Sequence, residues 1–265
     1  SFLSSDELKK LELEVEDMVR ELEEIFALYD LDPFYGVIRN LIPFLNFEYY
    51  VRIQNQVKAE HYLEEIALLV EFQFKAHLWG FFISQFLLSL IYKLKQDGDS
   101  VSFLKLADKF RSGFFIEQNE SSHLVIFYRY KALAAFYQNN FSQAALDLNN
   151  LLNISTFKEL PNLAIELKLF QAFMYALQGD EDLYLKLTAS AKRKSAENED
   201  LTVSVKNFSK ILFLLNKSRH DRVDPQKMEH YWNRFSAAEG NPAKLLDFMH
   251  LNLELLTDLL KKPGI

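Results

Sequence analysis

The chain of 265 residues contains no cysteine. This absence excludes disulfide frameworks, thiolate nucleophiles, cysteine zinc sites and iron–sulfur clusters, and it is compatible with a reducing compartment. Glycine and proline are scarce, with seven and six copies, too few for the many turns of an all-β protein. Most of them fall between periodic apolar segments, where helices should end. The sequence therefore predicts an all-α fold.

Long hydrophobic runs are also missing. The most apolar run, Leu78 to Tyr92, has 15 residues and includes Ser84, Gln85 and Ser89, whereas a membrane-spanning helix needs about 20 apolar residues. We therefore expect a buried core helix there and no membrane insertion. The opening residues 1–7 have neither the basic nor the apolar part of a signal peptide. We expect a cytoplasmic protein.

Motifs for catalysis and cofactor binding are missing as well. The six histidines show no metal-ligand spacing, no two glycines lie close enough for a phosphate loop, and no serine lies in a nucleophile elbow. Asp97-Gly98-Asp99 has the start of a calcium loop, but no further ligands follow at the required positions, so we interpret it as a capped turn. The sequence therefore predicts no enzyme activity, no cofactor and no metal site.

What the chain does have is a repeated turn. Gln96-Asp97-Gly98-Asp99, Gln138-Asn139-Asn140-Phe141 and Gln178-Gly179-Asp180-Glu181 each follow an apolar helical pattern, 42 and 40 residues apart. A looser copy, Gln54-Asn55-Gln56-Val57, lies one period upstream, and a worn one, Asn216-Lys217-Ser218, lies downstream. Repeats of this length are typical of stacked helical hairpins.

Around these turns the apolar pattern predicts five helical hairpins and one closing helix. Hydrophobic residues make up 49 % of the chain, which is ample for a core shared between neighbouring hairpins. The predicted pairs are 37–53 with 58–73, 76–95 with 101–117, 121–137 with 141–153, 161–177 with 181–196, and 199–216 with 225–238, and a capping helix covers 242–260.

An acidic amphipathic helix is expected over residues 6–30, in a first domain that covers 1–32. Its apolar residues step by three and four positions, in a seam formed by Leu8, Leu11, Val15, Met18, Leu22, Ile25 and Tyr29. Residues 1–32 hold eleven acidic and three basic side chains, whereas residues 192–234 hold ten basic and six acidic ones. The helix either packs on its own chain or forms a homodimer through 6–30. In the first case we expect its acidic face near the basic segment.

The third hairpin has small and aromatic residues at positions that are typical of a known repeat. Ala132 and Ala144 fall where its two helices cross, and Phe136 and Phe141 flank the polar turn. This pattern resembles the tetratricopeptide repeat (TPR), and the fourth hairpin shares part of it. The resemblance implies a TPR-like right-handed α-α superhelix over residues 33–265, and it identifies no subfamily.

In such repeats the first helices of the hairpins line an inner groove, which receives a peptide or helix of a partner. The resemblance therefore implies a non-enzymatic scaffold for protein–protein interaction. Tyr231 and Trp232 add an aromatic pair in the basic segment, which could also contact a partner. The groove positions that the resemblance places as candidate contacts are Arg129, Leu133, Phe136, Tyr137 and Phe173.

An alternative function is a ligand- or peptide-sensing regulatory domain with an aromatic-lined interior. The chain has 24 phenylalanines and 12 tyrosines, which could line a pocket or fill the core of long helical repeats. A nucleic-acid partner is not expected, because the basic segment lacks the glycine-rich or aromatic motifs of such proteins.

Overall fold

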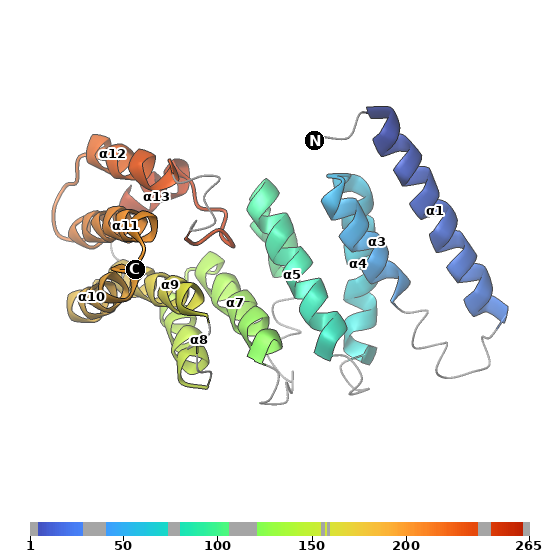
Figure 1. Ribbon diagram of the computed structural model, residues 1–265, viewed down its shortest axis with the longest axis horizontal. Coiled ribbons are helices and arrows are strands. Elements are labelled where there is room, and N and C mark those ends of the chain that lie inside the picture. The colour runs from blue at the N-terminus through green and yellow to red at the C-terminus, as the bar shows by residue number, and fades with distance from the viewer. Residues whose placement is uncertain are drawn as a thin grey trace. The chain divides into compact units, whose positions relative to one another are not determined.

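The structure is a computed structural model that describes residues 5–28, 41–73, 80–105, 121–154, 157, 160–237 and 245–261. All regular structure in these ranges is α-helical, which confirms the all-α prediction (Figure 1). The chain divides into two compact units, residues 1–82 and 83–265. The sequence-based boundary at residue 32 stays a prediction.

The first unit holds three described helices, α1 (Ser5–Leu28), α3 (Ile42–Arg52) and α4 (Gln56–Gln73). The hairpin of α3 and α4 buries Phe47, Leu63 and Ile66 completely. Residues 37–40, which were predicted to begin α3, lie outside the described ranges.

Glu16 ties α1 to this hairpin. Its Oε1 atom accepts hydrogen bonds from the Tyr50 hydroxyl at 2.9 Å and from Lys58 Nζ at 2.5 Å. The bond from Lys58, helped by the bond from Tyr50, lowers the pKa of the Glu16 carboxyl from its ordinary value of 4.5. The first helix therefore does contact its own chain. Its expected position near residues 192–234 concerns the other unit and stays a prediction.

The buried stripe of α1 differs from the predicted seam. Phe26 is buried and Val19 is half-buried, whereas Met18 and Ile25, two members of the seam, are 63 % and 45 % exposed. The face toward α3 and α4 is therefore rotated by about one position from the seam. Glu16, which bonds to the hairpin, and the buried Phe26 both lie on this rotated face.

The second unit contains α5 from Ile83 onward and eight further described helices. From α7 to α12 each helix packs on the next in chain order, and α9 also packs on α11. The third, fourth and fifth predicted hairpins match the observed helices to within two residues at each end. The helices are α5 (Gly80–Asp97), α6 (Ser100–Leu104), α7 (Ser121–Tyr137), α8 (Phe141–Ile154), α9 (Pro161–Gln178), α10 (Glu181–Ser195), α11 (Glu199–Lys217), α12 (Pro225–Ser236) and α13 (Leu253–Lys261).

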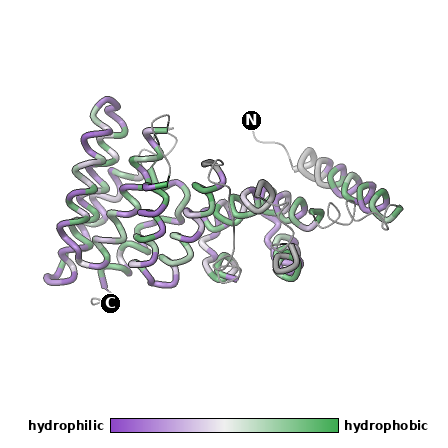
Figure 2. The backbone as a smooth tube through the Cα atoms, turned by 90° about the horizontal axis from the view of Figure 1, so that it is seen from below, coloured by the Kyte–Doolittle hydropathy of each residue, from purple (hydrophilic) through white to green (hydrophobic). Residues whose placement is uncertain are grey.

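Two further predictions meet the structure only in part. Of the second helix predicted over 101–117, the described part is α6, and residues 106–117 lie outside the described ranges. None of the described helices is long and apolar enough to cross a membrane. Figure 2 agrees, because hydrophobic and hydrophilic residues alternate along the helical tubes. In the most apolar stretch, α5 buries Leu87 and Leu90 but leaves Tyr92 partly exposed.

The repeated turn is a pair of residues with complementary backbone roles. The first has a positive φ, between 57° and 81°, and ends one helix in the left-handed conformation; these residues are Gln54, Gly98, Asn139 and Gly179. The second caps the next helix, because its side-chain oxygen accepts a backbone N–H; these residues are Asn55, Asp99, Asn140 and Asp180. The repeat seen in the sequence is therefore a repeated way of ending one helix and starting another.

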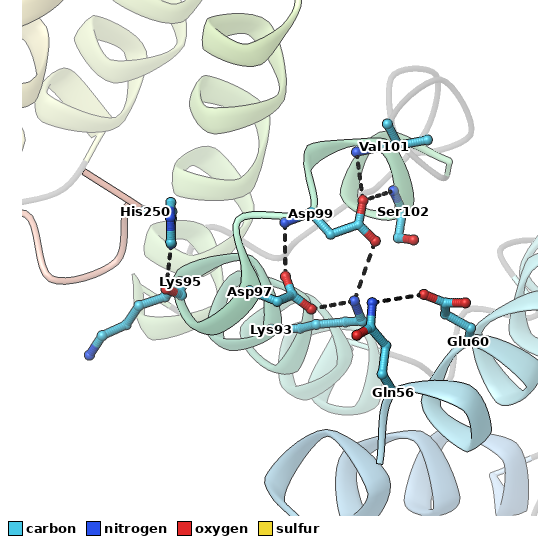
Figure 3. A network of polar contacts seen from close by, with 9 residues as sticks. All are labelled: Gln56, Glu60, Lys93, Lys95, Asp97, Asp99, Val101, Ser102 and His250. Carbon is cyan, nitrogen blue, oxygen red and sulfur yellow. Dashed lines mark hydrogen bonds and ion pairs between the residues drawn. The ribbon is translucent and has the colours of Figure 1, made fainter. Parts of the chain in front are cut away.

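Asp97-Gly98-Asp99 is confirmed as a capped turn. Asp99 Oδ1 accepts the N–H groups of Val101 and Ser102, each at 3.1 Å (Figure 3). Both aspartates pair with Lys93, at 2.6 Å for Asp97 and 3.4 Å for Asp99. One lysine of α5 thus contacts both carboxylates and offsets one of their two negative charges.

The capping helix predicted over 242–260 is wrong in its described first half. Residues 245–249 form turns, Leu246 has a φ of 61°, and α13 begins only at Leu253. The reason is a competing contact, because the backbone N–H of Leu246 is donated to Glu166 on α9.

Phenylalanine rings fill the centre of the second unit. The Phe208 ring centroid lies 5.2 Å from that of Phe235 and 5.9 Å from that of Phe173, which in turn lies 5.5 Å from Phe136. All four side chains are buried. Because the rings touch one another, these aromatic residues act as core packing between α7, α9, α11 and α12.

At the fourth of these left-handed turns, both the backbone conformation and the space around the residue should require glycine. A Cβ on Gly179 would lie 2.9 Å from Arg219 Nε, and the residue would keep a φ of 81°. We expect Gly179→Ala to lower the free energy of unfolding by about 1–2 kcal/mol, measured by urea denaturation. Asn139→Gly is the matched control at another left-handed turn, and it should cause no loss of that size. Equal losses in both variants would contradict this account.

The contact of α1 with the hairpin should weaken in acid. A carboxyl whose pKa is lowered by folding stabilises the fold above its unfolded pKa, and this contribution disappears as the pH falls below 4.5. Glu16 and Lys58 are each more than a third exposed, so the effect should stay below about 1 kcal/mol. At neutral pH, Glu16→Gln should speed amide hydrogen exchange in α1, and well below pH 4.5 variant and wild type should exchange alike. Glu14→Gln, at an exposed pair on the same helix, should have no such effect.

Candidate functional site

Residues 245–252, which we call the C-terminal segment, lie against α5, α7 and α9 in the second unit. Figure 1 shows the red part of the chain turning back toward α5. The segment contains no regular helix. Several of its residues each form a separate contact with one of these helices, through a side chain or through the backbone.

The deepest contact is made by Glu166 on α9. Its two carboxylate oxygens have different partners: Oε2 pairs with the Arg129 guanidinium on α7, and Oε1 accepts the backbone N–H of Leu246 at 2.8 Å. The Arg129 and Glu166 side chains are only 18 % and 13 % exposed. Burial raises the pKa of Glu166, and the guanidinium and the Leu246 N–H act in the opposite direction. The carboxylate therefore joins two helices to the segment.

Phe248 packs directly on this ion pair. The guanidinium carbon of Arg129 lies 4.5 Å from the Phe248 ring centroid, in a cation–π contact. The Phe170 ring on α9 meets Phe248 edge-on, with centroids 5.2 Å apart. One aromatic side chain of the segment is thus held by a cation from one helix and a ring from another.

The turn after α5 holds the other end of the segment. Lys95 Nζ pairs with Asp247 at 2.5 Å. The carbonyl oxygen of Lys95 is 2.8 Å from His250 Nδ1 (Figure 3). Asn252 uses its Oδ1 to cap α13, so its Nδ2 is the donor toward His250 Nε2 at 3.1 Å. This assignment makes Nδ1 the protonated nitrogen, which donates to the Lys95 carbonyl. A Cβ on Gly98 would lie 2.9 Å from the imidazole, so this glycine leaves room for the ring.

The sequence-predicted groove residues divide into two groups. Leu133, Phe136 and Phe173 are at most 3 % exposed and belong to the core. A partner cannot reach these three side chains while the helices stay packed, so their predicted role as contacts stays a prediction that would require the helices to separate. Arg129 and Tyr137 lie on the side of α7 that faces the C-terminal segment.

Tyr231 and Trp232 line different hollows, because neighbouring residues of a helix point in different directions. Trp232 lines a cavity of about 210 Å³ beside the segment, together with Leu245 and His250. Tyr231 lines a separate cleft of about 480 Å³, whose wall also contains Phe213 and several basic residues: Lys210, Lys217, Arg222 and Lys227. The predicted aromatic pair is therefore partly accessible, but it is not one contact surface.

Sequence reasoning missed Lys95, Asp247 and His250, because it treated residues 242–260 as one helix. The available signal was Asn252, a favoured N-cap residue followed by acidic Glu254 in the first helical turn. This signal places the helix start at residue 252, but it does not reveal where the preceding residues lie.

The contacts at the site are tertiary contacts between the C-terminal segment and the helices. A carboxylate accepts a main-chain N–H, a lysine pairs with an acidic side chain, and an aromatic side chain fits between a ring and a guanidinium. Among the residues that the structure describes, no group of three or more acidic or histidine side chains could hold a metal ion.

Two tyrosines on α7 should respond differently to loss of their hydroxyl groups. Tyr130 donates to the Phe103 carbonyl at 2.9 Å, whereas the buried Tyr137 hydroxyl has no hydrogen bond of normal geometry within the described ranges. Burial raises the pKa of Tyr137 to about 12, and the His250 backbone N–H acts in the opposite direction.

We expect Tyr130→Phe to lower the free energy of unfolding by about 1–2 kcal/mol and Tyr137→Phe to change it by less than about 0.5 kcal/mol. Chemical denaturation of both variants measures the difference. Similar losses in the two would show that the Tyr137 hydroxyl is bonded after all.

A scan against protein-family models, a search of curated proteins and a search of solved structures all found no match. The resemblance to the tetratricopeptide repeat therefore rests on the residues of the chain itself.

Proposed function

We propose that the chain is a non-enzymatic, TPR-like helical-repeat scaffold that binds another protein through the face formed by α5, α7 and α9. The observation that carries the proposal is the C-terminal segment, because this face already holds a length of non-helical polypeptide. The groups that hold it, Lys95, Arg129 and Glu166, contact an acidic side chain, an aromatic ring and a main-chain N–H, which a partner segment with those side chains could also supply.

The helix packing supports a repeat architecture for this scaffold. Consecutive helices pack in chain order from α7 to α12, and the same turn chemistry recurs at a period near 40 residues. A right-handed superhelix over residues 33–265 is the arrangement that the resemblance implies. In such a stack the recognition surface is extended, since each hairpin packs mainly on its neighbours. We place the protein in the cytoplasm.

A homodimer through residues 6–30 is a further part of the proposal. Leu13, Met18, Ile25 and Leu28 on α1 are all exposed. These apolar side chains are available to the same helix of a second copy.

A ligand- or peptide-sensing regulatory domain is the second candidate. It is favoured by the cleft of about 480 Å³ at α11 and α12, where Tyr231 and Phe213 provide rings and four basic side chains provide charge. A small anionic aromatic molecule has the chemistry that suits this cleft.

Selection from a displayed library of random peptides tests the scaffold proposal. We expect the intact chain to enrich a family of sequences, and synthetic versions should bind several-fold more weakly to Lys95→Ala than to wild type. Lys186→Ala, at an exposed lysine on α10, should bind like wild type. If no sequences are enriched and small molecules raise the melting temperature in a parallel screen, the sensor is the better description.

A further inference from the structure

We infer that the C-terminal segment occupies the recognition face as an internal ligand, and that a partner segment with the order leucine, acidic residue, phenylalanine displaces it. This inference rests on the proposed function, and it names both the ligand chemistry and the regulation of that site.

The ligand chemistry follows from three consecutive residues. Leu246 offers its backbone N–H to Glu166, Asp247 pairs with Lys95, and Phe248 lies against Arg129 and Phe170. Leu246 therefore contacts α9 and Asp247 contacts α5. Phe248 contacts both α7 and α9. Because consecutive residues have separate partners, the face favours a segment with this order of side chains over a segment that is only apolar.

The face should keep its form when the segment leaves. Glu166 is paired with Arg129 as well as with Leu246, so its buried charge retains a partner after release of the main-chain N–H. The Lys95–Asp247 pair is more than a third exposed, and its groups can be solvated separately. Leu246 has a φ of 61°, a strained conformation for a residue with a β-carbon, and this strain favours release.

Apolar burial limits what can replace the segment. Leu245, Leu246, Phe248 and Met249 are all buried, and their exposure to water opposes spontaneous release. An effective competitor must therefore bury a comparable apolar surface, which a peptide with aromatic and aliphatic side chains does and a simple anion does not.

A peptide of residues 245–252 provides the test. Fluorescence anisotropy should measure binding of labelled, acetylated and amidated Leu-Leu-Asp-Phe-Met-His-Leu-Asn to the full chain and to Asp247→Asn, in which the resident segment has lost its ion pair. We expect at least about fivefold tighter binding to Asp247→Asn than to wild type, because the apparent affinity rises with the open fraction of the site. A peptide with alanine in place of phenylalanine should not bind. Adding Lys95→Ala to Asp247→Asn should abolish the gain.

Hydrogen exchange of wild type gives a second measurement that needs no variant. Saturating peptide should speed exchange at the backbone amides of residues 246–249 by at least about tenfold, a change of about 1.4 kcal/mol in the opening free energy. If those amides stay protected with peptide present and the peptide binds neither protein, the segment is a permanent part of the core and the inference fails.

Two other outcomes separate the inference from the proposed function. If Asp247→Asn forms concentration-dependent dimers by light scattering, with the segments exchanged, the occupant is a second copy and the partner assignment is overturned. If library peptides bind the wild-type face but the segment peptide does not, the scaffold function stands and the internal-ligand inference falls.

Discussion

The carboxylate of Glu166 connects parts of the second unit that are distant in the chain. One oxygen pairs with Arg129 on the preceding hairpin, and the other accepts the main-chain N–H of Leu246, 80 residues further on. A charge this well buried is stable only with such partners. The same arrangement brings Phe248 of the C-terminal segment into its cation–π contact with Arg129.

The helical pairs, by contrast, depend on short-range chemistry. A residue in the left-handed conformation ends one helix and allows backbone N–H groups to bond to its last carbonyl groups. The side-chain oxygen of the following Asn or Asp accepts an N–H group at the start of the next helix. Because both helix ends are satisfied within a few residues, each hairpin can form with little help from distant parts of the chain. Packing of the phenylalanine rings then joins successive hairpins.

The sequence therefore predicted these helices well, but it did not predict that residues 245–252 lie against them. Leu133, Phe136 and Phe173 have the spacing of inner-face residues, but the same spacing serves a buried core, and side-chain type alone does not distinguish the two. Only Arg129 and Tyr137, with Trp232 at the adjoining cavity, lie beside the segment that the structure places there.

By itself the sequence determined where the helices from α7 to α12 begin and end, the all-α class and the lopsided charge, since each of these follows from residues close together in the chain. Only the tertiary structure decided which stripe of α1 is buried and where residues 245–252 run. In both cases the observed arrangement includes a polar contact between distant residues, Glu16 with Lys58 and Glu166 with Leu246, that the local apolar pattern does not contain. A local pattern cannot encode such a contact, because the energies of the competing arrangements depend on partners that only folding brings together.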